Sequence, residues 1–196
     1  MITLYHAPQS RSSRFIWLLE EIGTPYEIVY CSIRRQNTNS GEPDPKNPNL
    51  TGKVPYLDHD GVRFGESTAI AIYLADRFPS AGLAPALDSP ARGPYLEWMA
   101  YYTGELEPMM FAIWRNDTSP PALRQKEQVF AKMSKQLTDH PYIAGDAFTA
   151  ADILYASAFS WAAEWLPQGP SIDAYKARIN ARPAVAHAHA KDSAPT

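Results

Sequence analysis

A loop at residues 8–14 carries hydroxyl and cationic side chains immediately before a helical pattern. A hydroxyl that donates to sulfur, the N–H groups of a helix start and a nearby cation each favour a thiolate over a thiol. These residue types therefore predict a loop that lowers the pKa of a bound thiol, whose ordinary value is about 8.5. We place Ser10 first for this role, Ser12 second and Arg11 as electrostatic support. The structural alternative is that the serines only cap the helix.

A second segment, residues 52–70, combines a proline with a helix start. Val54-Pro55 lies in a strand-like run, and because proline cannot donate a ladder hydrogen bond, we expect it at a sheet edge beside free backbone. Glu66-Ser67 opens a helical pattern, with Ser67 as the expected N-cap. Helix starts present unpaired N–H groups and a positive dipole, which hold a carboxylate. A free strand edge beside an anion pocket suits a short, extended, acidic peptide, and glutathione is such a peptide.

The elements that position these segments follow a β-α-β-β-β-α order. The initial β-α-β pattern requires a crossover and hence a parallel pair of strands, and Asp58-His59-Asp60-Gly61 carries the Asp-Gly signal of a hairpin. This order predicts an α/β thioredoxin-like domain over residues 1–78. Its expected elements are a strand at 2–6, a helix at 15–22 capped by Gly23, a strand at 27–33, hairpin strands at 54–57 and 62–64, and a helix at 67–78.

The rest of the chain predicts an all-helical bundle domain at 90–196, after a Pro/Ala/Ser-rich linker at 79–89. Its first helix is expected to start at Ser89-Pro90 and to kink at Pro108. Thr149 to Asp152 has the form of a capping box, which we interpret as structural. The remaining expected parts are a helix after Pro120-Pro121, a central helix from the capping box through Trp165, a last helix at 175–184 stopped near Pro183, and a loosely held tail at 187–196.

Composition restricts the class of protein. Apolar residues make up 45% and charged residues 20% of the chain, as in soluble globular proteins, and the net charge of −3 provides no basic field for nucleic acid. There is neither an apolar run of membrane-spanning length nor a signal-peptide pattern, so we expect a cytoplasmic protein without a membrane partner. The single cysteine, Cys31, fits a reducing compartment and is expected to be a buried hydrophobe. The five histidines show no metal spacing, so no metal is expected.

Four motifs, in order, resemble the cytosolic glutathione S-transferase family. Residues 1–14 look like the first strand and catalytic loop of that family, and Val54-Pro55 is similar to its Val-Pro pair, in which the proline is cis. Glu66-Ser67 resembles the pair that opens its third helix, and residues 145–152 resemble its capping box in the helical domain. The loop has no cysteine, and Glu107 replaces a histidine that some cysteine-type bacterial members carry. The chain is therefore identified as a member of a bacterial serine-type or related class.

The resemblance implies how glutathione is held. A cis Pro55 is expected to turn the backbone N–H and C=O of Val54 toward the cysteinyl residue. Ser67 is expected to hold the γ-glutamyl carboxylate, and Glu66 to pair with the γ-glutamyl amino group. The expected partners of the glycyl carboxylate are cationic: Lys53 first, and then Arg34 and Arg35.

The resemblance also implies a homodimeric detoxification enzyme that uses glutathione as co-substrate. The glutathione thiolate would attack an electrophilic carbon of a small hydrophobic substrate held between the two domains. Candidate residues for that second pocket lie along the long helix, namely Tyr101, Trp114 and Arg115. Aromatic residues at helical spacing are also typical of a core, so a purely structural role is the alternative.

Other activities on the same fold stay open. Without a cysteine in the loop, the chain is predicted to lack a nucleophile of its own for disulfide exchange. It could still reduce peroxides or mixed disulfides with glutathione as the only thiol, or isomerise a maleyl-type double bond through thiolate addition. The non-enzymatic alternative is a binding or regulatory module, which would have no need of the γ-glutamyl pocket that Glu66-Ser67 predicts.

Overall fold

The structure is a computed structural model that describes residues 1–35 and 38–193. Two compact units make up the chain. The first unit combines Met1–Ala81 with the C-terminal segment Arg182–Thr196, and the second is Gly82–Ala181. No helix among the described residues is both long enough and apolar enough to cross a membrane.

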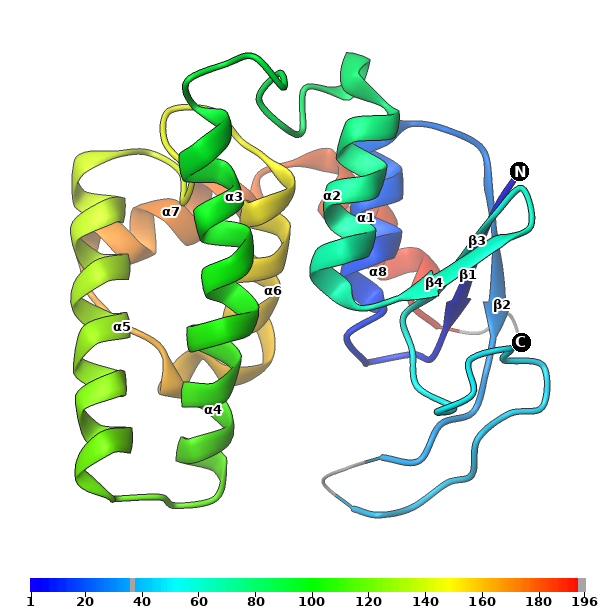
Figure 1. Ribbon diagram of the computed structural model, residues 1–196, viewed down its shortest axis with the longest axis horizontal. Helices are drawn as coiled ribbons and strands as arrows, with labels where there is room; N and C mark the ends of the chain where they lie inside the picture. The colour runs from blue at the N-terminus through cyan, green and yellow to red at the C-terminus, as the bar shows by residue number, and fades with distance from the viewer. Residues whose placement is uncertain (36–37, 194–196) are drawn as a thin grey trace. The chain divides into compact units, whose positions relative to one another are not determined.

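The first unit is built on a four-stranded mixed sheet (Figure 1). The strands are β1 (Ile2–His6), β2 (Tyr26–Tyr30), β3 (Tyr56–His59) and β4 (Val62–Gly65), in the order β2-β1-β3-β4. β1 is parallel to β2 and antiparallel to β3, which is antiparallel to β4. With α1 (Ser13–Ile22), α2 (Ser67–Arg77) and a 3₁₀ turn (Pro79–Ala81), these strands confirm the thioredoxin-like prediction.

Local sequence signals explain several of these boundaries. β1 alternates as expected, with Ile2, Leu4 and His6 buried. Gly23 ends α1 in the left-handed region at φ 70°, and its N–H donates to the Leu19 carbonyl oxygen. The β3–β4 hairpin closes through Asp60 and Gly61, both at positive φ, as a two-residue type I′ turn requires.

The position of Pro55 differs from the prediction. β3 lies between β1 and β4 and is therefore an interior strand, whereas the sequence suggested that the proline sits in an edge strand. Pro55 is tolerated because it immediately precedes Tyr56, the first residue of β3, where it removes no ladder hydrogen bond. The strand consequently begins two residues later than predicted.

The C-terminal segment departs furthest from the prediction. A helix, α8 (Pro183–Lys191), occupies residues expected to form a loose tail, and it packs against α1 of the first unit. The predicted helix at 175–184 corresponds to α7 (Pro170–Asn180), which does end shortly before Pro183, but a new helix follows it because proline at the first helical position costs no hydrogen bond. The expected helical domain at 90–196 therefore loses its last part to the thioredoxin-like unit. Residues 194–196 of the predicted tail lie outside the described residues.

The second unit consists of helices. α3 (Arg92–Tyr101) begins after Ser89, which accepts the Ala91 N–H, so the helix starts slightly later than predicted. A π-helical turn (Tyr102–Leu106) separates α3 from α4 (Glu107–Trp114) just before Pro108, where a kink was expected. The other helices are α5 (Pro120–Asp139), α6 (Ala150–Ala162), a 3₁₀ turn (Ala163–Trp165) and α7 (Pro170–Asn180).

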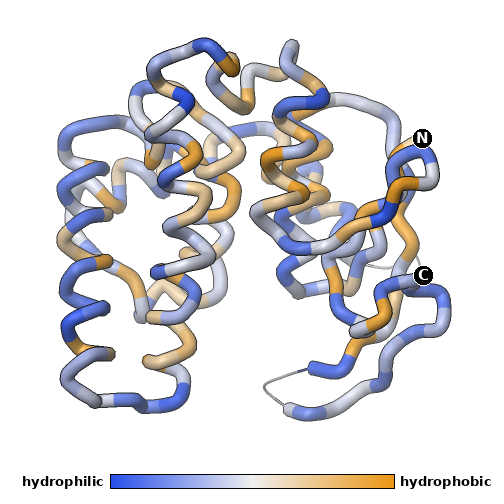
Figure 2. Tube along the Cα trace, in the orientation of Figure 1, coloured by the Kyte–Doolittle hydropathy of each residue, from blue (hydrophilic) through white to orange (hydrophobic). Residues whose placement is uncertain are grey.

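Most hydrophobic residues of α5 and α6 lie where these helices are buried. α5 alternates between hydrophilic and hydrophobic stretches (Figure 2), and its buried residues Val129, Met133 and Leu137 recur every four positions. α6 is buried along most of its length, as predicted for a central helix. Its capping box is confirmed, because the Thr149 N–H donates to Asp152 Oδ2 at 2.8 Å.

Candidate functional site

Sheet register brings the three predicted binding segments to one end of the sheet. The loop at residues 7–12 leaves β1 after His6. Tyr56 at the start of β3 lies opposite Tyr5, so Val54-Pro55 lies at the same end as this loop. Tyr56 also pairs with Gly65, the last residue of β4, so Glu66-Ser67 follows at that end as well. Segments more than forty residues apart are thus neighbours because the strands run antiparallel.

Ser12 is the centre of the loop. Its side chain is completely buried, and its Oγ lies 2.7 Å from His6 Nδ1, 2.7 Å from Ser10 Oγ and 3.1 Å from the Ala7 N. Ser10 is only partly buried, and its Oγ also accepts the Ser12 N–H at 3.2 Å. Ser10 therefore retains access to solvent, whereas Ser12 makes only internal contacts.

His6 fixes the direction of these hydrogen bonds. Its Nε2 lies 3.1 Å from the Asp192 carbonyl oxygen and 3.4 Å from Asp192 Oδ1. Both of these atoms are acceptors, so Nε2 carries the hydrogen. Burial lowers the pKa of His6 from 6.5, outweighing the hydrogen bond and negative charge of Asp192, so the ring is neutral at pH 7. Nδ1 then accepts the hydroxyl hydrogen of Ser12.

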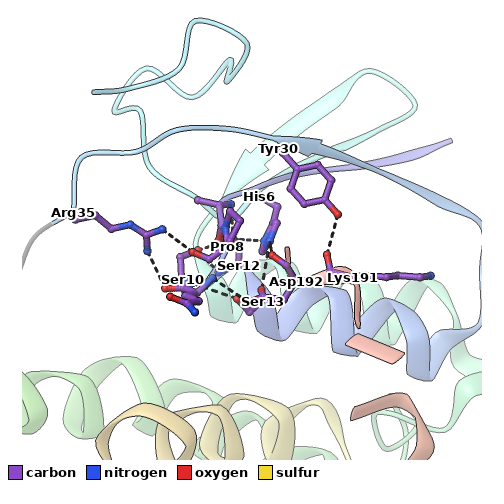
Figure 3. Close-up of polar contacts among 11 residues, drawn as sticks. His6, Pro8, Ser10, Ser12, Ser13, Tyr30, Arg35, Lys191 and Asp192 are labelled. Atoms are coloured by element: carbon purple, nitrogen blue, oxygen red, sulfur yellow. Dashed lines mark hydrogen bonds and ion pairs between the residues drawn. The ribbon is translucent and has the colours of Figure 1, made fainter. Parts of the chain in front are cut away.

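Two side chains from distant parts of the chain hold the loop from either side (Figure 3). Arg35, after β2, donates to the carbonyl oxygens of Pro8 at 2.6 Å and Gln9 at 2.9 Å. Asp192, after α8, accepts the Gln9 N–H through Oδ2 at 3.0 Å. Gln9 itself adopts the left-handed conformation, with φ 52°. Arg35, a weaker candidate for the glycyl carboxylate, is thus occupied with the loop, and Arg34 binds both carboxylate oxygens of Glu42.

The Val54-Pro55 peptide bond is cis, as the resemblance implied. Among the described residues, neither the N–H nor the C=O of Val54 has a backbone partner. The preceding turn is shaped by Asn47 and Asn49, whose amides both donate to the Lys53 carbonyl oxygen at 3.1 and 2.8 Å. Gly52 has φ 65°, and a Cβ there would lie 2.6 Å from Pro43 Cβ. The Lys53 side chain is exposed.

Glu66 and Ser67 form the start of α2, but with roles shifted by one residue from the prediction. Glu66, not Ser67, is the N-cap, and its carbonyl oxygen accepts the Ile70 N–H at 3.0 Å. Ser67 is the first helical residue, so its N–H has no partner within the helix. Glu66 has φ 66° and ψ 120°, a conformation that is costly for a residue with a Cβ and is concentrated at functional sites.

The three second-substrate candidates are not gathered in one place. Tyr101 ends α3 and lies under the Lys132 ammonium, with Nζ 4.3 Å from its ring centroid. Trp114 ends α4 and is exposed, and Arg115 stacks over Phe111 at 5.9 Å. Thirteen helical positions separate Tyr101 from Trp114, which is about 20 Å. The shallow polar hollow between α4 and α5 is lined by other residues, among them Glu105, Asp117 and Arg124.

Cys31 directly follows β2, outside the loop. It is buried, and burial raises the pKa of its thiol. Its Sγ contacts the Val29 carbonyl oxygen at 3.5 Å. It is therefore a buried, protonated thiol at neutral pH. No group of three or more His, Cys, Asp and Glu side chains within the described residues is placed to hold a metal ion.

Sequence reasoning missed four residues of this site. Asn47 and Asn49 lie in a loop whose polar composition gave no hint of their shared acceptor. His6 looks in the sequence like any alternating strand residue, and Asp192 lies in the supposed tail. By contrast, the spacing of Ser10 and Ser12, two positions apart, is a signal that can be recognised in the sequence. A serine hydroxyl at this spacing can accept the backbone N–H two residues later, as Ser10 Oγ does from Ser12.

Comparison with known proteins gives a consistent class. The model of the glutathione S-transferase N-terminal domain matches residues 1–76, and that of the glutathione S-transferase C-terminal domain matches residues 110–183. The fold and the matched domains define a two-domain protein with a thioredoxin-like unit and a helical unit. The chain belongs to the glutathione S-transferase family of enzymes.

Individual members of the family align with most of the chain. Glutathione S-transferase GstA of Escherichia coli O157:H7 is 29% identical over 164 residues, which is 81% of each chain. The disulfide-bond oxidoreductase YfcG of Escherichia coli (strain K12) is 25% identical over 96% of this chain and 94% of its own. A sphingomonad glutathione S-transferase, solved in complex with glutathione, superposes with a TM-score of 0.78 at 31% identity over 97% of this chain and 98% of its own.

Proposed function

We propose that this protein binds glutathione at the end of the sheet described above and transfers it to a hydrophobic electrophile. The observation that carries the proposal is that Ser10, the free backbone of Val54 and the start of α2 share this end of the sheet. Ser67 holds the γ-glutamyl carboxylate and Glu66 its amino group, while Val54 pairs with the cysteinyl backbone. This places the cysteinyl sulfur toward the loop that contains Ser10.

Ser10 is the residue that meets the sulfur in this proposal. It is partly exposed, whereas Ser12 is buried among internal partners, which favours Ser10 for direct contact. A hydroxyl hydrogen bond and the positive end of α1 stabilise the thiolate, with Arg11 adding positive charge. The thiolate then forms a bond to an electrophilic carbon, and the leaving group departs with the electrons of the broken bond.

The test is the ionisation of bound glutathione. The thiolate absorbs in the ultraviolet more strongly than the thiol, so its absorbance against pH gives the pKa of the bound thiol. We expect saturable binding and a pKa at least about one unit below the ordinary value of about 8.5. An unshifted pKa would refute thiolate stabilisation, and no binding at millimolar glutathione would refute the site itself.

A disulfide-reducing activity is a second candidate, favoured by the similarity to the disulfide-bond oxidoreductase. The buried Cys31 cannot supply the attacking thiolate, so glutathione must be the only reactive thiol. One glutathione thiolate would attack the substrate disulfide, forming a mixed disulfide with one half and releasing the other half as a thiolate. A second glutathione thiolate would attack the glutathione sulfur of that mixed disulfide, forming glutathione disulfide and releasing the remaining half as a thiolate. Comparing the rate of mixed-disulfide reduction with the rate of conjugation to an aryl halide separates the two activities. Cys31→Ala is expected to retain whichever is present.

We also propose that the protein forms a homodimer, as its family resemblance implies. Leu50, in the turn before Val54, has a fully exposed side chain in the single chain. A single exposed leucine is common on monomer surfaces, so the family resemblance carries this proposal, and Leu50 is the position at which we test it.

A further inference from the structure

We propose that His6 and Asp192 are positioning residues for Ser10, and that through Ser12 they set whether Ser10 presents its oxygen or its hydrogen to the ligand sulfur. This proposal rests on the proposed function, because it assumes that a thiol is bound at Ser10. It concerns four side chains connected in series: Asp192, His6, Ser12 and Ser10 (Figure 3).

With a neutral His6, every hydrogen in the series points inward. His6 Nε2–H donates to the Asp192 carbonyl oxygen, and the Ser12 hydroxyl donates to His6 Nδ1 over 2.7 Å. Ser12 Oγ then accepts the Ala7 N–H at 3.1 Å and the Ser10 hydroxyl at 2.7 Å. Ser10 consequently shows a lone pair to the site. A lone pair accepts hydrogen from a thiol but repels a thiolate.

With a protonated His6, the series reverses. Nδ1–H donates to Ser12 Oγ, and the Ser12 hydroxyl donates to Ser10 Oγ at 2.7 Å in preference to the more distant Ala7 carbonyl oxygen at 3.3 Å. The Ser10 hydroxyl hydrogen is then released to donate to the sulfur. Asp192 is already placed for the added charge. Its Oδ1 is buried 3.4 Å from His6 Nε2 and has no hydrogen bond to any described residue, while Oδ2 is used by the Gln9 N–H. A small rotation lets the imidazolium donate to this unused oxygen.

The surroundings of His6 favour the neutral ring until a negative charge arrives. Burial has the largest effect and lowers the pKa, and the Arg35 guanidinium lowers it as well, whereas the Asp192 carboxylate raises it. The Tyr30 ring packs edge-on against the imidazole, 5.6 Å between centroids, and is uncharged at neutral pH. A thiolate at Ser10 adds a negative charge near His6, and it is stabilised by a hydrogen bond that Ser10 can donate only when His6 is protonated. Both effects favour protonated His6.

The proton balance is closed. As the thiol ionises, its proton passes to Ser10 Oγ, the Ser10 proton passes to Ser12 Oγ and the Ser12 proton passes to His6 Nδ1. One S–H bond breaks, one N–H bond forms, and both serines end with the hydrogen count that they had at the start. Exchange through solvent gives the same end state, so the equilibrium consequence does not depend on the route.

The experiment compares two ligands by NMR. Glutathione has an ionisable thiol, and S-methylglutathione presents the same peptide without one. The imidazole nitrogens of His6, assigned with His6→Gln, are followed against pH in protein with labelled histidine. We expect the pKa of His6 to be higher with glutathione than with S-methylglutathione by about one unit, the size of effect that a hydrogen-bonded charged partner produces.

Ser12→Ala tests whether the effect travels through the series. It removes the connecting hydroxyl but leaves all charges, so most of the difference between the two ligands should disappear. Ser80→Ala, an exposed serine of the same unit, should preserve the difference. Asp192→Asn retains an oxygen for the Gln9 N–H but removes the charge, and should raise the pKa of the bound glutathione thiol.

The outcomes are distinguishable. Equal His6 pKa values with both ligands in the wild-type protein overturn the proposal even if glutathione binds and ionises, and this comparison needs no variant to fold. A difference that survives Ser12→Ala shows a direct charge effect and also overturns it. Binding of neither ligand refutes the proposed glutathione site, and the positioning role with it.

Discussion

The Arg182 guanidinium binds both carboxylate oxygens of Glu21, with Nε 2.6 Å from Oε1 and Nη2 2.7 Å from Oε2, across 161 positions of the chain. Glu21 is nearly buried and also accepts the Trp17 indole N–H at 2.9 Å. At the other end of α8, Lys191 donates to Glu20 at 2.6 Å and its carbonyl oxygen accepts the Tyr30 hydroxyl. α8 is thus fixed at both ends to the thioredoxin-like unit, and Asp192 is held where it meets His6.

Arg182→Ala is expected to destabilise the first unit by about 1–3 kcal/mol, because it removes the bidentate cationic partner of a nearly buried Glu21 carboxylate. Urea unfolding measures the loss. Lys135→Ala, which breaks an exposed pair with Asp139, is the matched control and should change little. Equal effects of the two substitutions would show that the Arg182 pair does not anchor α8.

Glu66→Ala combined with Ser67→Ala is expected to weaken glutathione binding by about 100-fold, since two charge-assisted contacts to the γ-glutamyl group are lost. Calorimetric titration measures the dissociation constant, and an unchanged far-UV spectrum shows that the fold is retained. Glu27→Ala, an exposed glutamate on β2, should bind as the wild-type protein does. Unchanged affinity of the double variant would remove the proposed pocket.

Ser10→Ala is expected to raise the pKa of the bound thiol by about one unit and to lower kcat/KM at neutral pH by about tenfold, because the thiolate loses a hydroxyl donor. Ultraviolet titration and steady-state kinetics provide the two values. The affinity for S-methylglutathione should stay the same, which separates loss of activation from loss of binding. If neither value moves, the role passes to Arg11 or to the helix start.

Asp152 gives the helical unit a pH dependence. Burial raises its pKa to about 6 from 3.8, against hydrogen bonds from Ile143, Thr149 and Tyr175 that favour the carboxylate. Between these two pH values the folded state binds more protons than the unfolded state, so the free energy of unfolding should rise as pH falls from about 6 to 4, by on the order of 2–3 kcal/mol from this group.

The comparison that isolates this group is wild-type protein against Asp152→Asn, measured by urea unfolding at several pH values. The free energy of unfolding of the wild-type protein minus that of the variant should increase as the pH falls toward 4. A difference that is flat across this range would show that Asp152 does not take up the proton. At neutral pH, Asp152→Ala should cost about 2–5 kcal/mol, because the buried Ile143 and Thr149 N–H groups lose their acceptor.

Sedimentation at micromolar concentration is expected to show a dimer, and Leu50→Asp should shift it toward a monomer. A charge in a desolvated interface opposes association, whereas the same change on a free surface is neutral. Leu87→Asp, at another exposed leucine, is the control. A wild-type monomer would contradict the proposed dimer directly.

Local signals were sufficient for most of the first unit. Alternation predicted β1, Gly23 the end of α1, and the Asp-Gly pair the hairpin, because each depends on neighbours in sequence. α8 escaped prediction for the opposite reason. Its stretch of alanines and histidines has little amphipathic pattern, and its stability comes from packing on α1 and from the Arg182 pair.

The candidate site divides in the same way. Residue type and spacing were enough to select the loop serines, Val54-Pro55 and Glu66-Ser67 as candidates, although the N-cap of α2 is Glu66 and not Ser67. His6 could not be recognised, since its partners are Ser12 inside the loop and Asp192 at a separation of 186 positions. No pattern within a window of sequence records such a pairing, and only the folded chain brings the residues together.

The return of α8 to the first unit also affects the order in which the protein is made. During synthesis, residues 1–81 leave the ribosome long before Arg182. The face of α1 that α8 covers therefore stays uncovered while Gly82–Ala181 is synthesised. The helical unit is continuous in sequence and can complete its core first. The unit that begins the chain is therefore finished last, and with it the loop that Asp192 holds.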